Sequence, residues 1–204
     1  WQRAMKEFGI HFTLEDSYAT EGARGVDTIR KYAKTQLGKE LSEDEAQRIY
    51  DVKAHYFHEM PEAKVFDGVI DLMRKIKKSG LKIGIVTGSA QLPLIERVTR
   101  DFGEFLSKDQ ITTAYDVKRG KPNPDPYLMG LQKAGNYSPS EGIVVENAPL
   151  GVHAGVVAGC YTVAINSGPL ADSMLLKEGA NILFPTIREF ADSWEHVLER
   201  LTKR

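Results

Sequence analysis

Apolar residues follow helical spacing over the first part of the chain, and no segment there shows the alternation typical of a strand. The first such residues are Trp1, Ala4, Met5 and Phe8. Further along, Ser42 is followed three positions later by Glu45, a capping-box pattern that begins a helix. We therefore predict an all-helical domain over residues 1–62. Because its first helix already starts at Trp1, we expect this N-terminus to be truncated.

A different pattern begins near residue 63. A segment with helical spacing runs to Gly80, and short apolar runs then alternate with further helical segments. These runs are "LKIGIVTGS", "ITTAYD", "GIVVEN", "CYTVAIN" and "NILFP". Short apolar strands separated by helices are typical of βαβ units around a buried parallel sheet. Residues 63–204 are thus predicted to form an α/β domain, closed by a last helix over residues 187–201.

Composition and charge exclude several classes of function. The 204 residues carry a formal net charge of -1, so no broad basic surface is available for nucleic acid or an anionic membrane. Cys160 is the only cysteine, which excludes an intrachain disulfide and a multi-cysteine metal site. No apolar run is long enough to span a bilayer. We expect a cytoplasmic monomer that binds neither nucleic acid nor membrane.

Three of the predicted strands end in polar residues. Thr87 ends one strand, Lys121 lies in the loop that follows another, and Glu146 with Asn147 ends a third. In open α/β sheets, ligands bind beyond the carboxyl ends of the strands. We expect these side chains to converge on one crevice.

Thr87, Gly88 and Ser89 are a candidate phosphate-binding segment. Free N–H groups at the start of the next helix would suit an anion, and the Thr87 hydroxyl could add a hydrogen bond. The alternative is that Ser89 only caps that helix.

Lys121 is a candidate partner for a phosphoryl oxygen. It lies between Gly120 and Pro122, a rigid setting that a surface lysine does not need. The alternative is a solvated lysine, with Pro124 simply starting the next helix.

Glu146 and Asn147 are candidate ligands for Mg²⁺. This cation prefers oxygen ligands and keeps several waters, so one carboxylate and one amide oxygen could complete a site with a carboxylate from elsewhere. The alternative is a loop in which Asn147 only caps the following helix.

The order strand–Thr, loop–Lys–Pro and strand–Glu–Asn resembles the second, third and fourth motifs of the haloacid dehalogenase (HAD) superfamily. The helical segment before them resembles the cap of the β-phosphoglucomutase-like subgroup. The segments "EGARG", "DVKRGKPNPDPYLM", "VVENAPLGV" and "INSGPL" are similar to those of a bacterial inorganic pyrophosphatase of that subgroup. The resemblance covers essentially the whole chain and implies a Rossmann-like core with a helical cap.

The resemblance also implies roles for the residues. Thr87, with the backbone near Gly88 and Ser89, would hold the transferring phosphoryl group, and Lys121 would neutralise its charge. Glu146 and Asn147 would bind or orient Mg²⁺. Glu21 and Arg24 of "EGARG" match the cap loop that selects the substrate. The implied reaction is hydrolysis of pyrophosphate or a small phosphate monoester through an aspartyl-phosphate.

The chain departs from the family pattern in its first motif, an Asp-x-Asp that carries the nucleophile. No such motif is present, and the expected first strand is missing. Asp67 and Asp71 are four residues apart at the start of a helix, where an acid stabilises the helix end. Asp116 precedes the Lys121 loop and matches no family role. We expect neither Asp67 nor Asp116 to be the nucleophile.

A second departure is Asn147, where many relatives carry Asp. The amide oxygen brings no charge, so the site is one negative charge short and should favour a more anionic substrate such as pyrophosphate. Two other functions stay open: a phosphosugar mutase of the same subgroup, and a non-catalytic fragment without its nucleophile.

Overall fold

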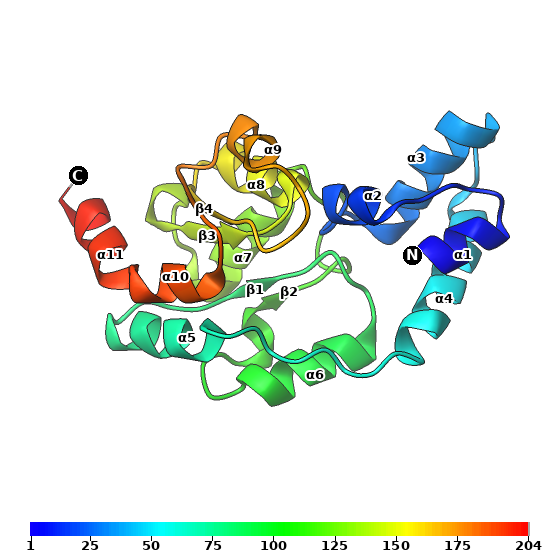
Figure 1. The fold of residues 1–204 in the computed structure, drawn as a ribbon. Helices are drawn as coiled ribbons and strands as arrows, with labels where there is room; N and C mark the ends of the chain where they lie inside the picture. Colours follow the sequence, from blue (N-terminus) through cyan, green and yellow to red (C-terminus); the bar gives the residue numbers. More distant parts are fainter. Residues whose placement is uncertain (204) are drawn as a thin grey trace.

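The computed structural model describes residues 1–203, and its first four helices form a small helical domain (Figure 1). These helices are α1 (Gln2–Glu7), α2 (Leu14–Ala19), α3 (Gly25–Leu37) and α4 (Glu43–His58). The predicted capping box is present at α4: the Ser42 hydroxyl accepts from the backbone N–H of Glu45 at 3.2 Å, and Glu45 accepts from that of Ser42 at 2.8 Å. A second box, Thr13 with Asp16, begins α2. Local sequence thus determines where two of these helices begin.

The helical domain has its own apolar core. Met5, Ile29 and Ala33 are fully buried, and Ile49 of α4 packs with them. The four residues come from three helices, spaced by helical periodicity as the sequence predicted. The boundary that we place at residue 62 stays a prediction.

The second part of the chain has five short parallel strands in two separate sheets. The strands are β1 (Ile85–Val86), β2 (Ile111–Thr112), β3 (Ile143–Glu146), β4 (Tyr161–Ile165) and β5 (Ile182–Phe184). Strand β1 pairs with β2, whereas β4 lies between β3 and β5. One edge of β1 and one edge of β3 therefore have no strand partner within residues 1–203. Val145 of β3 is 39% exposed, which is unusual for a strand residue of a two-sided parallel sheet.

Helices pack on both faces of these sheets. They are α5 (Val69–Lys78), α6 (Leu92–Phe102), α7 (Asp125–Gly135), α8 (Pro149–Val157), α9 (Asp172–Lys177), α10 (Ile187–Asp192) and α11 (Trp194–Thr202), with 3-10 turns at Lys108–Gln110 and Pro139–Glu141. The sequence predicted one last helix, but the chain breaks at Ser193 between α10 and α11. Phe190 of α10 and Trp194 of α11 both enter the core, where each is at most 2% exposed.

Two helices hold the separate sheets together. Helix α5 places Leu72 in the apolar cluster around β4 and Met73 in the cluster around β1 and β2. On α7, Tyr127 packs with Val144 of β3 and Val86 of β1. The two sheets therefore belong to one core although no strand joins them.

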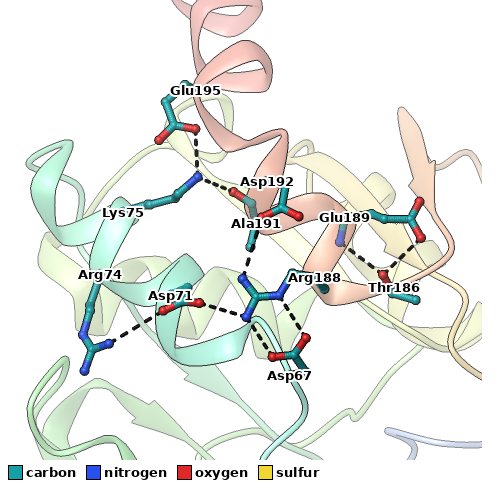
Figure 2. A network of polar contacts seen from close by, with 10 residues as sticks. All are labelled: Asp67, Asp71, Arg74, Lys75, Thr186, Arg188, Glu189, Ala191, Asp192 and Glu195. Carbon is teal, nitrogen blue, oxygen red and sulfur yellow. Dashed lines mark hydrogen bonds and ion pairs between the residues drawn. The ribbon is translucent and has the colours of Figure 1, made fainter.

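An extended segment connects α4 to α5, and an ion-pair network fixes its end to α10 (Figure 2). Arg188 donates to both carboxylate oxygens of Asp67, at 3.0 and 2.8 Å, and lies 2.8 Å from a carboxylate oxygen of Asp71. Gly68, with φ of 90°, lies so close to α10 that an added Cβ would be 2.6 Å from the Arg188 Cα. The segment is thus held against the core by charge and by direct backbone contact.

Gly68→Ala should destabilise the protein more than the matched change Gly80→Ala. Both glycines have a positive φ, but Gly80 has no atom within 4 Å of the added Cβ. We expect a loss of about 1 kcal/mol for Gly80→Ala from backbone strain alone, and roughly 3 kcal/mol for Gly68→Ala because α10 must also move. Urea unfolding of both variants measures the difference, and equal losses would contradict the close contact.

Candidate active site

Two of the three predicted strand ends, those of β1 and β3, meet at the ammonium of Lys121, which belongs to the loop that follows the third strand. Its Nζ donates to the backbone carbonyl of Val86, at the end of β1, at 3.3 Å. It also donates to the Glu146 carboxylate at the end of β3. Lys121 thus joins the ends of the two strands that have no common partner. The side chains of Lys121 and Glu146 are only 4% and 9% exposed.

The loop that carries Lys121 is fixed at both ends. Arg119 donates to both carboxylate oxygens of Asp125, at 3.1 and 2.9 Å, which closes the loop onto the first residue of α7. Asn123 donates through its backbone and its side chain to the carbonyl of Gly120, at 3.1 and 2.9 Å. These hydrogen bonds hold the loop in one conformation, and that conformation directs the Lys121 side chain into the core.

The carboxylate of Glu146 is held at three points. One oxygen accepts from the Lys121 ammonium and the Tyr127 hydroxyl, and the other accepts from the N–H of Asn147 at 3.1 Å. Burial alone would raise the pKa of Glu146, but the Lys121 charge and these hydrogen bonds outweigh it and hold that pKa below its ordinary value. Glu146 is therefore the buried anionic partner of Lys121.

Thr87 and Ser89 lie in a loop before α6, and not in the helix itself. The Thr87 hydroxyl accepts from the N–H of Ser89 at 3.1 Å, and the Ser89 hydroxyl accepts from the N–H of Gln91 at 3.1 Å. The residue that precedes α6 is Gln91, so Ser89 is not the cap of that helix. Gly88, Ser89 and Thr87 instead form a compact turn beyond β1.

The loop between α2 and α3 of the helical domain covers this site. The Asn147 side chain donates to Glu21 at 2.9 Å. An added Cβ on Gly22 would lie 3.1 Å from the Lys121 Cδ, and one on Gly88 would lie 2.3 Å from the Gly22 carbonyl oxygen. The helical domain and the core therefore meet through direct backbone contact above the lysine.

Arg24 lies beside the site with its charge already paired. It lies 3.1 Å from Glu43 and 3.8 Å from Asp27, both in the helical domain. Its Nη1 also donates to the carbonyl of Lys118 at 3.4 Å, and its side chain covers Gly120. Of the two predicted cap residues, Glu21 is thus the one in contact with the strand-end residues, whereas Arg24 contacts the Lys121 loop.

The net charge of the site is suited to binding a cation. Burial raises the pKa of the Glu21 carboxyl, and its neighbour Glu146 adds to this rise. With Glu21 and Glu146 ionised, the single charge of Lys121 leaves one negative charge unbalanced. Glu21, Glu146 and the Asn147 amide oxygen are hard oxygen donors of the kind that suits Mg²⁺. No group of three or more His, Cys, Asp or Glu side chains within residues 1–203 is arranged to hold a metal ion, so such an ion needs a further ligand or waters.

The other carboxylates that we considered lie in different surroundings. Asp67 is bound to Arg188, and its side chain is 80% exposed. Asp116 pairs with Lys133 at 2.7 Å and accepts from Thr113 at 2.7 and 2.9 Å. Neither contacts Lys121, Glu146 or Thr87.

Sequence reasoning missed two contacts at the site. Tyr127 was not singled out, because a tyrosine in the first turn of a helix is indistinguishable from an ordinary core aromatic. The hydrogen bond from Gln91 to the Tyr50 hydroxyl, 3.0 Å, joins the core to α4 across 41 positions of sequence. Only the fold brings such residues together.

The comparisons with known proteins agree with this fold. The model of the family "Haloacid dehalogenase-like hydrolase" matches residues 1–165. The chain is 32% identical over 193 residues to "Validoxylamine A 7'-phosphate phosphatase" of Streptomyces hygroscopicus subsp. limoneus, covering 92% of this chain and 88% of that protein. It is 33% identical over 104 residues to "Putative pyrophosphatase PpaX" of Clostridium perfringens, covering 51% of this chain and 48% of that protein.

A solved structure shows the same arrangement over nearly the whole chain. "Putative beta-phosphoglucomutase from Bacteroides vulgatus" superposes with a TM-score of 0.92 at 42% identity, covering 98% of this chain and 81% of that one. Among these curated relatives, the share of the relative that the chain spans ranges from about half to nine-tenths.

The fold and the strand-end site define an α/β protein with a helical cap. The chain belongs to the haloacid dehalogenase-like hydrolase family, whose members among its relatives are phosphatases and β-phosphoglucomutases. The predicted family and fold class are thereby confirmed. None of the helices within residues 1–203 is long and apolar enough to cross a membrane.

Gly88→Ala should displace the helical domain from the core while leaving both folded. The added methyl group would overlap the Gly22 carbonyl, which belongs to the opposite domain, so the cap loop must retreat. Gly84→Ala is a matched control, because the nearest atom to its added Cβ is at an ordinary 3.4 Å. Amide hydrogen exchange over residues 20–25 should become faster by about tenfold in Gly88→Ala and stay unchanged in the control. Unchanged exchange in both variants would mean that the domains do not meet at Gly88.

Proposed function

We propose that this protein is a Mg²⁺-dependent phosphohydrolase that acts on inorganic pyrophosphate or a small phosphate monoester through an aspartyl-phosphate. The observation that carries the proposal is the buried Lys121 ammonium at the meeting point of β1 and β3, with Thr87 and the Gly88–Ser89 turn beside the same strand end. A buried cation next to a hydroxyl and the backbone N–H groups of a turn is suited to a dianionic phosphoryl group. We also propose that the protein acts as a monomer in the cytoplasm.

Each residue has a distinct role in this proposal. Thr87 and the N–H groups near Gly88 and Ser89 bind the phosphoryl oxygens. Lys121 neutralises the charge that moves from the nucleophile to the leaving group. The cap loop excludes bulk water from the site while substrate is bound.

The nucleophilic aspartate is proposed to come from a strand outside the 204 residues. Support comes from the split sheet: β1 and β3 each have a free edge, and Lys121 contacts the carboxyl ends of both strands. A parallel strand between them would deliver its own last residues to the same point. The contacts of Asp67 and Asp116 with Arg188 and Lys133 argue against either as a substitute.

Glu146 and Asn147 would hold the Mg²⁺ ion, with Glu21 close enough to add a ligand. When bound, the ion would polarise the phosphoryl group and balance its charge. The unbalanced negative charge at the site supports this assignment.

Pyrophosphate is the substrate that these charges favour most among the candidates. Asn147 supplies an oxygen without a charge, so a metal held there keeps more of its own charge for a highly anionic substrate. The likeness to "Putative pyrophosphatase PpaX" is consistent with this choice.

A phosphosugar mutase is the second candidate, because "Putative beta-phosphoglucomutase from Bacteroides vulgatus" is 42% identical. A mutase must hold a second phosphate near the cap loop. Glu21 would repel it there unless Mg²⁺ or Arg24 intervened, which favours hydrolysis. Product analysis with a hexose 1-phosphate separates the two: free phosphate indicates a phosphatase, and a hexose 6-phosphate indicates a mutase.

Replacing Lys121 should abolish most of the turnover. In the protein carrying its whole natural chain, Lys121→Met keeps the aliphatic stem but removes the charge. Phosphate release from pyrophosphate with Mg²⁺ should fall by roughly a hundredfold or more. Asp67→Asn and Asp116→Asn serve as controls and should retain wild-type rates. Wild-type turnover in Lys121→Met, in a variant shown by circular dichroism to be folded, would refute the proposal, and loss of turnover in either control would identify a different nucleophile.

Glu21→Ala should reduce pyrophosphate turnover far more than that of p-nitrophenyl phosphate. Glu21 contacts Asn147 beside the proposed metal, where only the larger anion would engage it. We expect the ratio of the two kcat/KM values to change by about tenfold, the effect of losing one charge-assisted hydrogen bond. The control is Glu43→Ala, which removes another cap carboxylate, one paired with Arg24. Equal losses on both substrates would show that Glu21 only supports the loop.

A further inference from the structure

Tyr127 contacts both members of the buried ion pair. It lies in the first turn of α7 and is 7% exposed. Its hydroxyl donates to the same Glu146 oxygen that accepts from Lys121, and the Lys121 Nζ lies 4.8 Å from the centre of its ring. One side chain thus binds the carboxylate through its polar end and the ammonium through its aromatic face.

A buried ion pair needs such additional contacts. Taking two charges out of water costs several kcal/mol for each ion, and their attraction offsets this cost only when further hydrogen bonds complete the geometry. Glu146 has three donors around it: Lys121, Tyr127 and the N–H of Asn147. Gly151 makes room for the carboxylate in this position, since an added Cβ there would lie 2.1 Å from its carboxyl carbon. The orientation of Glu146 is thereby fixed from several sides.

The orientation of Glu146 decides where the Lys121 ammonium points. A lysine has three N–H donors. Within residues 1–203, two of them are used, one by Glu146 and one by the carbonyl of Val86. With two directions fixed, the third N–H has a defined direction as well. A carboxylate free to rotate would let the ammonium turn with it.

The ring of Tyr127 alone would satisfy the apolar packing. It lies in a cluster with Val144, Ala154 and Cys160, where a phenylalanine of the same shape would fit. The hydroxyl is therefore not explained by packing. Its contact with the Glu146 carboxylate is its one hydrogen bond within the described part of the chain.

We propose that Tyr127 is a positioning residue for phosphoryl transfer: its hydroxyl fixes Glu146, and Glu146 in turn directs the remaining N–H of Lys121 at the phosphoryl group. This inference rests on the proposed function, and it adds a residue that acts without touching the substrate. A misdirected ammonium would still bind an anion but would stabilise the transition state less well.

The test compares Tyr127→Phe with Tyr161→Phe in the protein carrying its whole natural chain. The control removes the hydroxyl of a half-buried tyrosine in β4, and this hydroxyl has no hydrogen-bond partner within residues 1–203. We expect Tyr127→Phe to lower kcat for phosphate release by about tenfold and to raise KM by less, about fivefold, because the misdirected ammonium binds the phosphoryl group more weakly and stabilises the transition state more weakly still. The control should retain the wild-type values of both constants.

A double-mutant cycle shows whether Tyr127 acts through Glu146. In a Glu146→Gln background, Tyr127→Phe should cause little further loss, since the carboxylate that the hydroxyl fixes is gone. Full additivity of the two losses, or an unchanged kcat in Tyr127→Phe, would overturn the proposal. A loss in Tyr161→Phe as large as in Tyr127→Phe would also overturn it, as a general packing effect.

A titration with inorganic phosphate separates this inference from the proposed function. If the wild-type protein hydrolyses none of the phosphate compounds, the proposed function fails. Tyr127 is then judged by calorimetry: a phosphate Kd raised about fivefold in Tyr127→Phe and unchanged in Tyr161→Phe supports the positioning role. Equal affinity in all three proteins, or no binding by any of them, overturns it.

Discussion

The buried interaction between Lys121 and Glu146 is the constraint on which the rest of the site depends. It joins the end of β1 to the end of β3, two strands that share no hydrogen-bonded neighbour. Breaking such a pair leaves an uncompensated buried charge, which is among the costliest changes in a protein core. The braced loop before α7, the absence of a side chain at Gly151 and the hydroxyl of Tyr127 all serve to keep this one contact in place.

The same constraint explains why the helical domain approaches so closely. Gly22 passes over the Lys121 side chain, Gly88 meets the Gly22 carbonyl, and Gly120 lies under Arg24. Each contact requires a residue without a side chain, in the cap or in the core. A side chain at Gly22 would press on the Lys121 stem, because an added Cβ would lie 3.1 Å from its Cδ. The backbone of the loop thereby places Glu21 beside Asn147, within hydrogen-bond distance.

Much of the fold could be predicted from the sequence, because the signals that define its elements are local. The capping box of Ser42 and Glu45 and the five apolar runs are short-range signals, and each corresponds to an observed element. The break at Ser193 was missed because the apolar period continues through it. The strand lengths were also overestimated: "LKIGIVTGS" contains only two strand residues, Ile85 and Val86, since β1 has a pairing partner on one side only.

For the site, the sequence predicted only that the residues at the strand ends lie close together. Thr87, Lys121 and Glu146 could be grouped because parallel strands present their carboxyl ends at one edge. Their individual interactions could not be derived, because these depend on residues far apart in sequence, such as Asn147 with Glu21 and Gln91 with Tyr50.

Asn147 connects the contact between cap and core to the charge of the site. An aspartate at this position would place a third carboxylate next to Glu146 and Glu21, whose pKa is already raised by burial and by Glu146. The amide avoids that repulsion and supplies two different groups at once: its N–H donates to Glu21 of the cap, and its carbonyl oxygen stays available for a cation. An aspartate could only accept hydrogen bonds and would push the cap loop away. The contact between the cap loop and the core is therefore compatible with Asn147 and would be opposed by an aspartate at this position, so the approach of the cap and the charge of the site are set by the same side chain.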